Sequence, residues 1–370
     1  MNEQLTLFDE KENSQPLKIL ELFGGIGAPR KSLQNIGFNL KSLDYVEVLP
    51  FAVMAYNSMF NCGYDPQDIR LWNMHPDILV HGSPCQDFSN EGKNNINTGR
   101  SILYERTLEI LDPHPVGRNP ELTKQPKVVV WENVPGLLYR HKEHLDHYLA
   151  TMESYGYHNY YKILSAEDYN CPQARPRLFT VSLLTEEPFV FPEKVELTRK
   201  LESIIDRDVD FSAYEPSPAE KEILFQLEDG TWCVREATKK GYKEIHDYQV
   251  VNLAFPNSKT RRGRVGDCAK TITTSPRQVI FYDGKFRLFT AKEYLRLMGY
   301  EDRDYNKMKK AGLTDAQITY LAGNSICVPV LEAIFKQIHS MGVIKKKGQF
   351  GPFFMQKETP RGNLSFAMNF

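Results

Sequence analysis

The sequence lacks the features that mark membrane, secreted and disulfide-rich proteins. No uninterrupted apolar run approaches the roughly 18 residues that a membrane-spanning helix needs. The first residues contain neither a basic segment nor an apolar one, so we expect no secretory signal and a cytoplasmic location. The six cysteines are scattered without a Cys-x-x-Cys pair, which favours free thiols in a reducing compartment over a disulfide framework.

An excess of charge of one sign is also missing. The 370 residues include 46 Lys and Arg and 47 Asp and Glu, which gives a formal net charge of −1. Taken alone, this balance argues against a nucleic-acid partner, because such proteins usually carry a basic surface. The remaining composition, 41% hydrophobic and 25% charged, is that of an ordinary globular protein, and the length predicts roughly two to three domains.

Short apolar strands alternate with helical stretches in the first half of the chain. We expect strands at 19–23, 43–46, 78–80, 128–131, 160–164 and 178–183, and helices at 29–36, 51–60, 103–111 and 143–155. This alternation predicts a parallel sheet covered by helices on both faces. The stretch 185–280 lacks it and predicts a second, smaller domain, with β-like runs at 248–253 and 271–274. Helical patterns return at 291–298, 317–323 and 328–338.

A glycine-rich turn, residues 24–27, follows the first expected strand and precedes a helix that opens near Pro29. Glycines let the backbone turn sharply and approach a ligand closely. Glu47 lies about 20 residues further on, at the end of the next strand, where a carboxylate can bind ribose hydroxyls. Because Arg30 stands where a dinucleotide motif needs its third glycine, a nucleoside ligand fits better than NAD. The turn alone is equally compatible with a structural role.

Reactive and charged side chains stand at the ends of three expected strands. A Cys at position 85 can act as a nucleophile if its pKa is lowered, although most free cysteines are inert small hydrophobes. Glu132 ends an apolar strand, a costly place for a carboxylate without a partner or ligand. Arg175 and Arg177, two apart on an extended segment, point the same way and suit carbonyl or phosphate oxygens. Singly each charged group is more often a surface ion pair, but jointly they predict a site.

These motifs, in this order, resemble the DNA (cytosine-5)-methyltransferases of the prokaryotic or phage type. The resemblance rests on Phe-Gly-Gly-Ile-Gly at 23–27, Gly-Ser-Pro-Cys-Gln-Asp-Phe-Ser at 82–89, Glu-Asn-Val at 132–134, Gln-Ala-Arg-Pro-Arg at 173–177, Arg-Leu-Met-Gly-Tyr at 296–300 and Gly-Asn-Ser at 323–325. It spans roughly residues 18–340, and Pro-Cys-Gln with the downstream Glu-Asn-Val is its most specific part. The chain departs from the family at Glu21, Gly24 and Ser83, where Asp, Ala and Phe are commoner.

The resemblance implies an α/β fold, the Rossmann-like fold of S-adenosylmethionine-dependent methyltransferases, with a smaller β-rich target-recognition domain. The implied domains are a discontinuous catalytic domain at 1–188 and 315–345, a target-recognition domain at 189–288, a hinge at 289–314 and a tail at 346–370. The implied cofactor residues are Phe23, Gly24, Gly25, Ile26, Gly27, Glu47, Asp68, Ile69, Pro84 and Asn324. Because Asn324 comes from the far end of the chain, the C-terminal helix should pack back onto the catalytic domain.

The implied reaction is methyl transfer to carbon 5 of a cytosine flipped out of a specific sequence in double-stranded DNA. Cys85 would add to carbon 6, Glu132 would hold the ring nitrogen and amine, and Arg177 with Arg175 would hold the carbonyl oxygen or a nearby phosphate. The group that accepts the carbon-5 proton stays open. Expected DNA contacts are Gln86, Ser89 and the basic loop residues Arg261, Arg262 and Arg264. We expect a monomer with no obligate protein partner.

Several alternatives remain at this stage. An RNA (tRNA) cytosine-5 methyltransferase shares the fold. The segment 190–280 favours DNA as the substrate, because it supplies a separate domain for recognising a DNA sequence. DNA methyltransferases that modify an exocyclic amine are another alternative. Their motif resembles Ser/Asn/Asp-Pro-Pro-aromatic, whereas this chain has Ser-Pro-Cys-Gln at 83–86. An NAD oxidoreductase leaves Cys85 and Glu132 unexplained, and a non-catalytic DNA-binding protein leaves the thiol, acid and arginines unused. His141, His144 and His147 lack the companions of a zinc site, so no metal is expected.

Overall fold

The computed structural model describes residues 16–71, 76–83, 103–114, 125–253, 255–260 and 262–346, without the side chains of 42, 43 and 71. The expected site residues Pro84, Cys85, Gln86, Ser89 and Arg261 lie outside the described residues, as does all but the first residue of the expected tail at 346–370.

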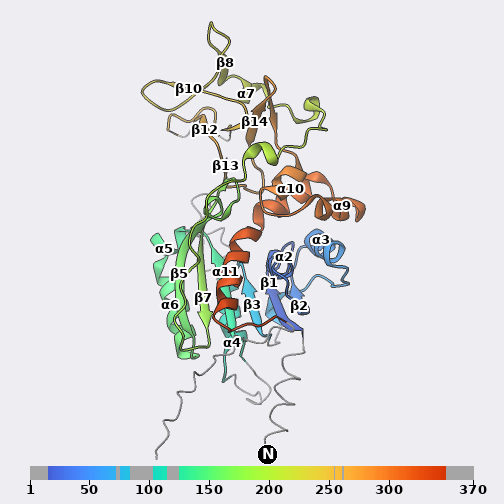
Figure 1. The fold of residues 1–370 in the computed structure, drawn as a ribbon, viewed down its shortest axis with the longest axis vertical. Helices are drawn as coiled ribbons and strands as arrows, with labels where there is room; N and C mark the ends of the chain where they lie inside the picture. Colours follow the sequence, from blue (N-terminus) through green and yellow to red (C-terminus); the bar gives the residue numbers. More distant parts are fainter. Residues whose placement is uncertain are drawn as a thin grey trace, which may run out of the picture.

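The larger part of the protein is built on one six-stranded sheet of order β2-β1-β3-β4-β7-β5 (Figure 1). The strands are β1 (Leu17–Leu22), β2 (Leu40–Val46), β3 (Ile78–His81), β4 (Val128–Asn133), β5 (His158–Ser165) and β7 (Pro176–Leu183), so all six expected strands are confirmed. The expectation of a wholly parallel sheet is wrong, because β7 runs antiparallel to both β4 and β5. Only ten residues join β5 to β7, too few for the crossover that parallel strands need.

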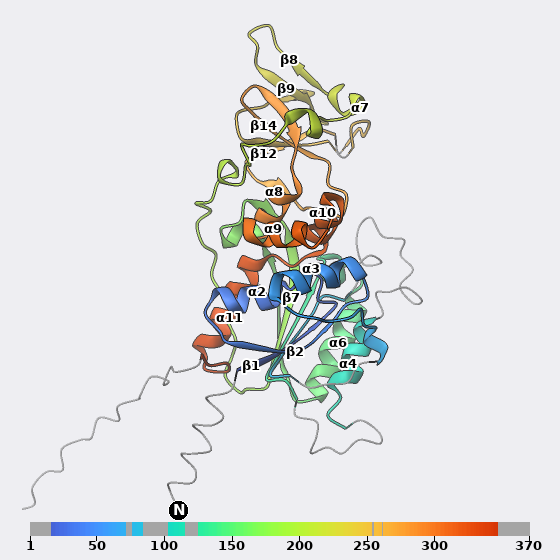
Figure 2. The same cartoon turned by 90° about the vertical axis from the view of Figure 1, so that its right-hand side faces the viewer.

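Helices cover both faces of this sheet (Figure 2). One face packs against α2 (Ala28–Asn35), α3 (Pro50–Phe60) and α11 (Val328–Ser340), and the other against α4 (Tyr104–Leu111), α5 (Gly136–Tyr139) and α6 (Lys142–Ser154). Successive residues of β4 enter the two cores in turn, Val128 and Val130 one core and Val129 and Trp131 the other. Helix α11 packs against α2, which confirms the expected return of the C-terminal helix to the part that contains the first strands.

One stretch in the described part of the chain, Asp315–Ser340, has the length and hydropathy of a membrane-crossing helix. It comprises α10 (Asp315–Asn324) and α11, and 67% of its most apolar window is buried inside the protein. Core helices of globular proteins pass the same test.

A smaller β-rich part lies at the far end of the molecule from the main sheet (Figure 1). It contains a three-stranded sheet of β8 (Leu224–Gln226), β9 (Trp232–Arg235) and β10 (Tyr242–Glu244), and a four-stranded sheet of β11 (Gln249–Asn252), β12 (Arg264–Gly266), β14 (Gln278–Tyr282) and β15 (Lys285–Leu288). These strands enclose a hydrophobic core of their own, and α7 (Pro218–Lys221) lies in the same part. All of these elements fall within 189–288; the exact domain bounds stay a prediction.

The expected strand at 271–274 is wrong. The short strand β13 (Ala269–Lys270) precedes it and pairs in parallel with β6 (Gln173–Ala174), which lies between β5 and β7 of the larger part. This pairing joins the small part to the large one.

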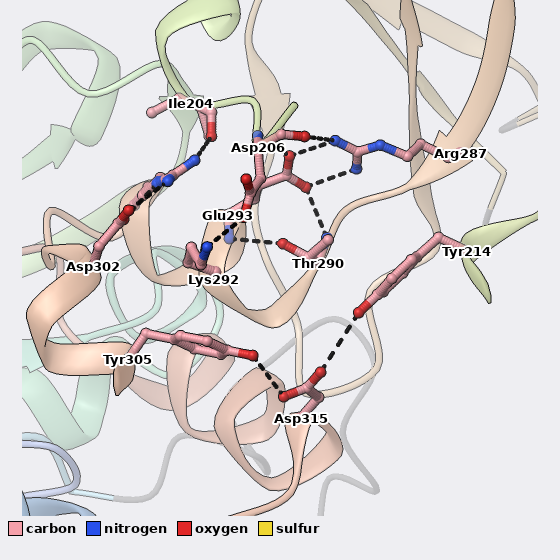
Figure 3. Close-up of polar contacts among 11 residues, drawn as sticks. Ile204, Asp206, Tyr214, Arg287, Thr290, Lys292, Glu293, Asp302, Tyr305 and Asp315 are labelled. Carbon is pink, nitrogen blue, oxygen red and sulfur yellow. Dashed lines mark hydrogen bonds and ion pairs between the residues drawn. The ribbon is translucent and has the colours of Figure 1, made fainter. Parts of the chain in front are cut away.

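The second junction is a buried polar network (Figure 3). It joins the segment that leads into the small part, through Asp206, to the end of β15 and to α8 (Ala291–Arg296). Arg287 and Glu293 form its centre, with no exposed side-chain surface and an Nη2–Oε1 distance of 2.5 Å. The backbone N–H of Asp206 donates to Glu293 at 2.7 Å, and Arg287 donates to the Asp206 carbonyl at 3.2 Å. Helices α9 (Asp302–Lys310) and α10 lie beside this network.

Candidate active site

The glycine turn between β1 and α2 is held by the side chains of Tyr45 on β2 and of Glu47, which follows that strand. The Gly25 N–H donates to Glu47 Oε2 at 3.1 Å, and the Gly25 carbonyl accepts from the Tyr45 hydroxyl at 2.6 Å. A Cβ on Gly24 would lie 2.6 Å from the Tyr45 ring, whereas a Cβ on Gly25 would meet nothing within 4 Å. Gly25 has a φ of 53°, so this half-buried stretch of backbone needs glycine, and the open space beside it is accessible to a ligand.

Glu21 lies fully buried beneath the same turn. Its Oε1 accepts from the N–H of Arg30, the third residue of α2, at 3.2 Å, and its Oε2 accepts a short hydrogen bond from the Tyr56 hydroxyl. Burial raises the pKa of Glu21 to about 7, although the hydrogen bonds from Tyr56 and Arg30 oppose the rise. The carboxyl therefore caps the start of α2 from another strand and fixes the turn.

A pocket opens beside the turn, at the carboxyl ends of β1, β3 and β4. Its lining comprises Glu21, Leu22, Phe23, Gly24, Gly25, Ala28, Pro29, Val80, Gly82, Glu132, Asn324, Ser325 and Ile326. The structure thus brings together four expected cofactor residues, Phe23, Gly24, Gly25 and Asn324, with the expected catalytic residue Glu132. Ligands of open α/β sheets bind at this edge of the sheet.

Of the expected cofactor residues that the structure describes, Ile26, Gly27, Glu47, Asp68 and Ile69 do not line this pocket. Ile26 is buried in the core, and Gly27 packs against the Phe60 ring, where a Cβ would come within 2.5 Å. Asp68 pairs with Arg70, and this hydrogen bonding lowers the pKa of Asp68 to about 2. Ile69 is buried, and its carbonyl accepts from Arg106 Nε at 3.3 Å. Roles for these residues with a ligand stay predictions.

Glu132 and Arg177 form an ion pair at the wall of the pocket. Arg177 Nε lies 3.1 Å from Glu132 Oε1, and both side chains are largely buried. Burial raises the pKa of Glu132, and the charges of Arg177 and then Arg175 oppose the rise. A Cβ on Gly82 would lie 3.7 Å from Glu132 Oε2, so the chain passes close to this carboxyl three residues before Cys85. Because its pKa is raised, the carboxyl takes up a proton more readily than an exposed glutamate and can donate it to a ring nitrogen.

Ser83, where the chain departs from the resemblance, is anchored by its neighbour strand. Trp131 Nε1 donates to Ser83 Oγ at 2.9 Å in a fully buried contact. The hydroxyl thus satisfies an indole N–H that would otherwise be buried without an acceptor. Trp131 precedes Glu132 and Ser83 precedes Pro84, so this hydrogen bond ties two expected parts of the site together.

Arg175 hydrogen-bonds with the backbone of distant segments. Its guanidinium donates to the carbonyls of Ile272, Gly323 and Ser325 at 2.8, 2.9 and 2.8 Å. The expected contact of Arg175 with a substrate oxygen stays a prediction.

The described residues of the expected DNA-binding loop belong to the small part. Arg264 is exposed on β12, Arg262 is half-buried, and Gly263 between them has a φ of 60°. A Cβ on Gly263 would overlap the carbonyl oxygen of Arg235, so the loop packs tightly on β9. In the part of the chain that the structure describes, no cluster of His, Cys, Asp or Glu is arranged to hold a metal, and the five described cysteines are free.

Sequence reasoning missed several residues that build the pocket. Glu21 offered a signal, because a carboxylate inside the apolar run 19–23 is unusual. Tyr45 and Tyr56 offered none, since their hydroxyls reach the turn and Glu21 only through the packing of β2 and α3 on β1.

The fold and the pocket define an α/β methyltransferase, and comparison with known proteins gives the family. The family model described as C-5 cytosine-specific DNA methylase matches residues 17–340. The chain is 31% identical over 272 residues to the type II methyltransferase M2.ScrFI of Lactococcus lactis subsp. cremoris, which covers 71% of this chain and 66% of that relative. It is 30% identical to M.NgoBI of Neisseria gonorrhoeae, over 86% of this chain and 92% of that one.

Solved structures agree on the fold. The Entamoeba histolytica methyltransferase EhMeth superposes with a TM-score of 0.60 at 19% identity, covering 88% of this chain and 99% of its own. The S. pombe Dnmt2 methyltransferase gives 0.60 at 17% identity, with the same coverage. The chain belongs to the C-5 cytosine-specific DNA methylase family. It is an enzyme, a DNA cytosine-5 methyltransferase, and its family implies methylation that depends on S-adenosylmethionine.

Proposed function

We propose that this enzyme transfers a methyl group from S-adenosylmethionine to carbon 5 of a cytosine flipped out of a specific duplex sequence, acting as a cytoplasmic monomer. The observation that carries the proposal is the Glu132–Arg177 ion pair at 3.1 Å beside a pocket lined by Phe23 and Asn324. This arrangement offers a proton donor and a guanidinium for a pyrimidine ring next to a ligand pocket.

The pocket fits the nucleoside cofactor on this chain's own features. The backbone at Gly25 is open, Phe23 supplies an aromatic wall, and Glu47 is a half-buried carboxylate beside the turn. We assign Glu47 to the ribose and Asn324 to the far side of the pocket. When bound, S-adenosylmethionine supplies an electrophilic methyl group.

The chain's residues then prepare the cytosine. Glu132 donates a proton to the ring nitrogen, which its raised pKa favours, and Arg177 holds the carbonyl oxygen. Both draw electrons away from carbon 6, so the thiolate of Cys85 can add there and make carbon 5 nucleophilic. After methyl transfer, loss of the carbon-5 proton expels Cys85. Flipping the base out costs a few kcal/mol of unstacking, which DNA contacts of the small part must offset.

Bisulfite sequencing of DNA from a methylation-free host that expresses the protein tests this proposal. We expect methylation within one sequence context, its loss in Cys85→Ser and a loss of about 10²–10⁴-fold in rate for Glu132→Gln. Cys268→Ser is the matched control, because this thiol lies in the small part near β13 and outside the pocket. Full methylation in Cys85→Ser would overturn the mechanism. A tritiated-methyl assay that labels tRNA and not duplex DNA would overturn the substrate.

The monomer and the DNA-reading loop need separate measurements. Light scattering after gel filtration should give a mass near 42.7 kDa. Replacing Arg262 and Arg264 with Ala should weaken DNA binding and reduce its salt dependence by roughly one counterion per lost phosphate contact. A salt slope equal to that of the wild type would contradict the assignment of this loop.

A further inference from the structure

The junction between β6 and β13 leads along the chain directly into Arg175 and Arg177, since β6 ends at Ala174. Ala269 pairs with Gln173 and Lys270 with Ala174, and the Thr271 hydroxyl donates to the Ala174 carbonyl at 2.9 Å. The contact continues along the chain, since Ile272 N–H donates to Gln173 Oε1 at 3.1 Å. The last residues before β14 of the small part are therefore bound to the segment that carries Arg175 and Arg177.

Arg175 extends this contact to a third segment. Of its three carbonyl partners, Ile272 belongs to the segment from the small part, and Gly323 and Ser325 are the two neighbours of Asn324. The side chain is buried, with 4% exposed. Asn324 lines the pocket, and its two flanking carbonyls are held by one guanidinium.

The position of these carbonyls explains why arginine stands here. Gly323 and Ser325 lie at the C-terminal end of α10, where backbone carbonyls lack helical partners and the helix dipole is negative. A guanidinium offers several N–H donors in one plane, so it can bind carbonyls from two segments at once, which an ammonium group does poorly. Close packing supports the same contact, because a Cβ on Gly323 would overlap the Thr273 carbonyl.

Arg175 also acts on the catalytic carboxyl. Its charge is second to that of Arg177 in lowering the pKa of Glu132, so the guanidinium lies within electrostatic reach of that carboxyl. The buried side chain of Arg175 therefore contacts the small part, binds the carbonyls on both sides of Asn324 and opposes the effect of burial, which raises the pKa of Glu132.

We propose that Arg175 is a positioning residue that fixes Asn324 in the cofactor pocket and ties it to the segment arriving from the small part. This inference rests on the proposed function, because it assigns the pocket to the cofactor. Arg175 itself does not line the pocket, so an effect of its replacement on ligand affinity must pass through pocket residues within its reach, the segment 323–325 or Glu132. Arg175→Lys keeps the positive charge near Glu132 and therefore tests mainly the hydrogen bonds to 323–325.

Calorimetric titration with S-adenosylhomocysteine, without DNA, tests the inference in the full chain. We expect Arg175→Lys to raise the Kd at least about tenfold, because misplacement by a fraction of an ångström is costly in such a site. Arg287→Lys is the matched control: it replaces another buried arginine that donates to backbone carbonyls, at the other junction. It should lower the melting temperature while leaving the Kd within about twofold of the wild type.

A second variant leaves Arg175 intact. Gly323→Ala inserts a methyl group against the Thr273 carbonyl and should also raise the Kd for S-adenosylhomocysteine, with the KM for the cofactor rising more than kcat falls. An unchanged Kd in Arg175→Lys and Gly323→Ala, or an equal rise in Arg287→Lys, would overturn the inference. If the wild type does not bind S-adenosylhomocysteine, the proposed function fails and the inference with it. Binding by the wild type with unaffected variants refutes the inference alone.

Discussion

Two junctions between the small part and the large one, the network around Arg287 and the β6–β13 pairing, use different chemistry. At the network of Figure 3, a fully buried ion pair, Arg287 with Glu293, holds the incoming and returning segments together. At the β6–β13 junction, a buried guanidinium is surrounded by neutral backbone carbonyls. Removing one member of the first junction leaves an uncompensated buried charge, whereas removing Arg175 takes donors from three neutral carbonyls and leaves Glu132 still paired with Arg177. The first junction should therefore govern stability, and the second should govern the pocket.

The largest effect is expected from Arg287→Met. This change leaves Glu293 buried without its cation, which typically costs about 3–5 kcal/mol of unfolding free energy. Urea denaturation monitored by circular dichroism measures the loss. A loss below about 1 kcal/mol would show that water reaches Glu293, and the contrast between the junctions would disappear.

Glu21 provides a buried carboxyl whose hydrogen-bond partners are a hydroxyl and a backbone N–H rather than a guanidinium. Its pKa is raised from 4.5 to about 7, so the folded state binds this proton more tightly than the unfolded state. Its contribution to stability is greatest below pH 4.5 and is lost as the pH rises through 7. Glu21→Gln should remove this dependence. The unfolding free energy of the variant, relative to that of the wild type, should therefore rise by up to about 3 kcal/mol between pH 4 and pH 8.

Denaturation curves of wild type and Glu21→Gln at several pH values measure that difference. Parallel pH profiles for the two proteins would mean that the raised pKa of Glu21 is absent in solution.

The double variant Arg287→Met with Glu293→Leu should lose less than Arg287→Met alone, because it leaves no buried charge. It still leaves the N–H groups of Asp206 and Thr290 without their acceptor, which we expect to cost about 2 kcal/mol. The same urea experiment orders the two variants. If the double variant is the less stable, the capping hydrogen bonds of Glu293 outweigh its ion pair.

The smallest effect is expected at the β6–β13 junction, from Thr271→Val. This change removes one hydrogen bond to the Ala174 carbonyl without burying a charge, and should cost about 1 kcal/mol. Its urea midpoint should shift far less than that of Arg287→Met. A comparable shift would mean that both junctions contribute equally to stability.

Much of the fold could be predicted from the sequence, because strand and helix periodicity extends over several residues. All six strands of the main sheet followed from it, but the direction of β7 did not, since direction depends on the connection and not on the pattern of the strand. Strands β6 and β13 have two residues each and carry no periodicity at all.

The site residues also fall into a predictable and an unpredictable group. The sequence motifs predicted Phe23, Glu132 and Asn324, which line one pocket. The carbonyl partners of Arg175 lie 97 to 150 residues away and are backbone atoms, which any residue type supplies, so no sequence pattern could reveal them. The near-zero net charge was misleading as well, because acidic residues elsewhere in the chain offset a local basic run such as 259–264.

The origin of Asn324 far from the glycine turn has a consequence for synthesis of the protein. The turn leaves the ribosome early, yet the wall of the pocket opposite it is encoded about 300 residues later. At a translation rate of roughly 5–20 residues per second, Asn324 is synthesised about 15–60 s after the glycine turn. A nascent chain therefore cannot complete the pocket until Asn324 has been translated, and a product truncated before that residue lacks this wall.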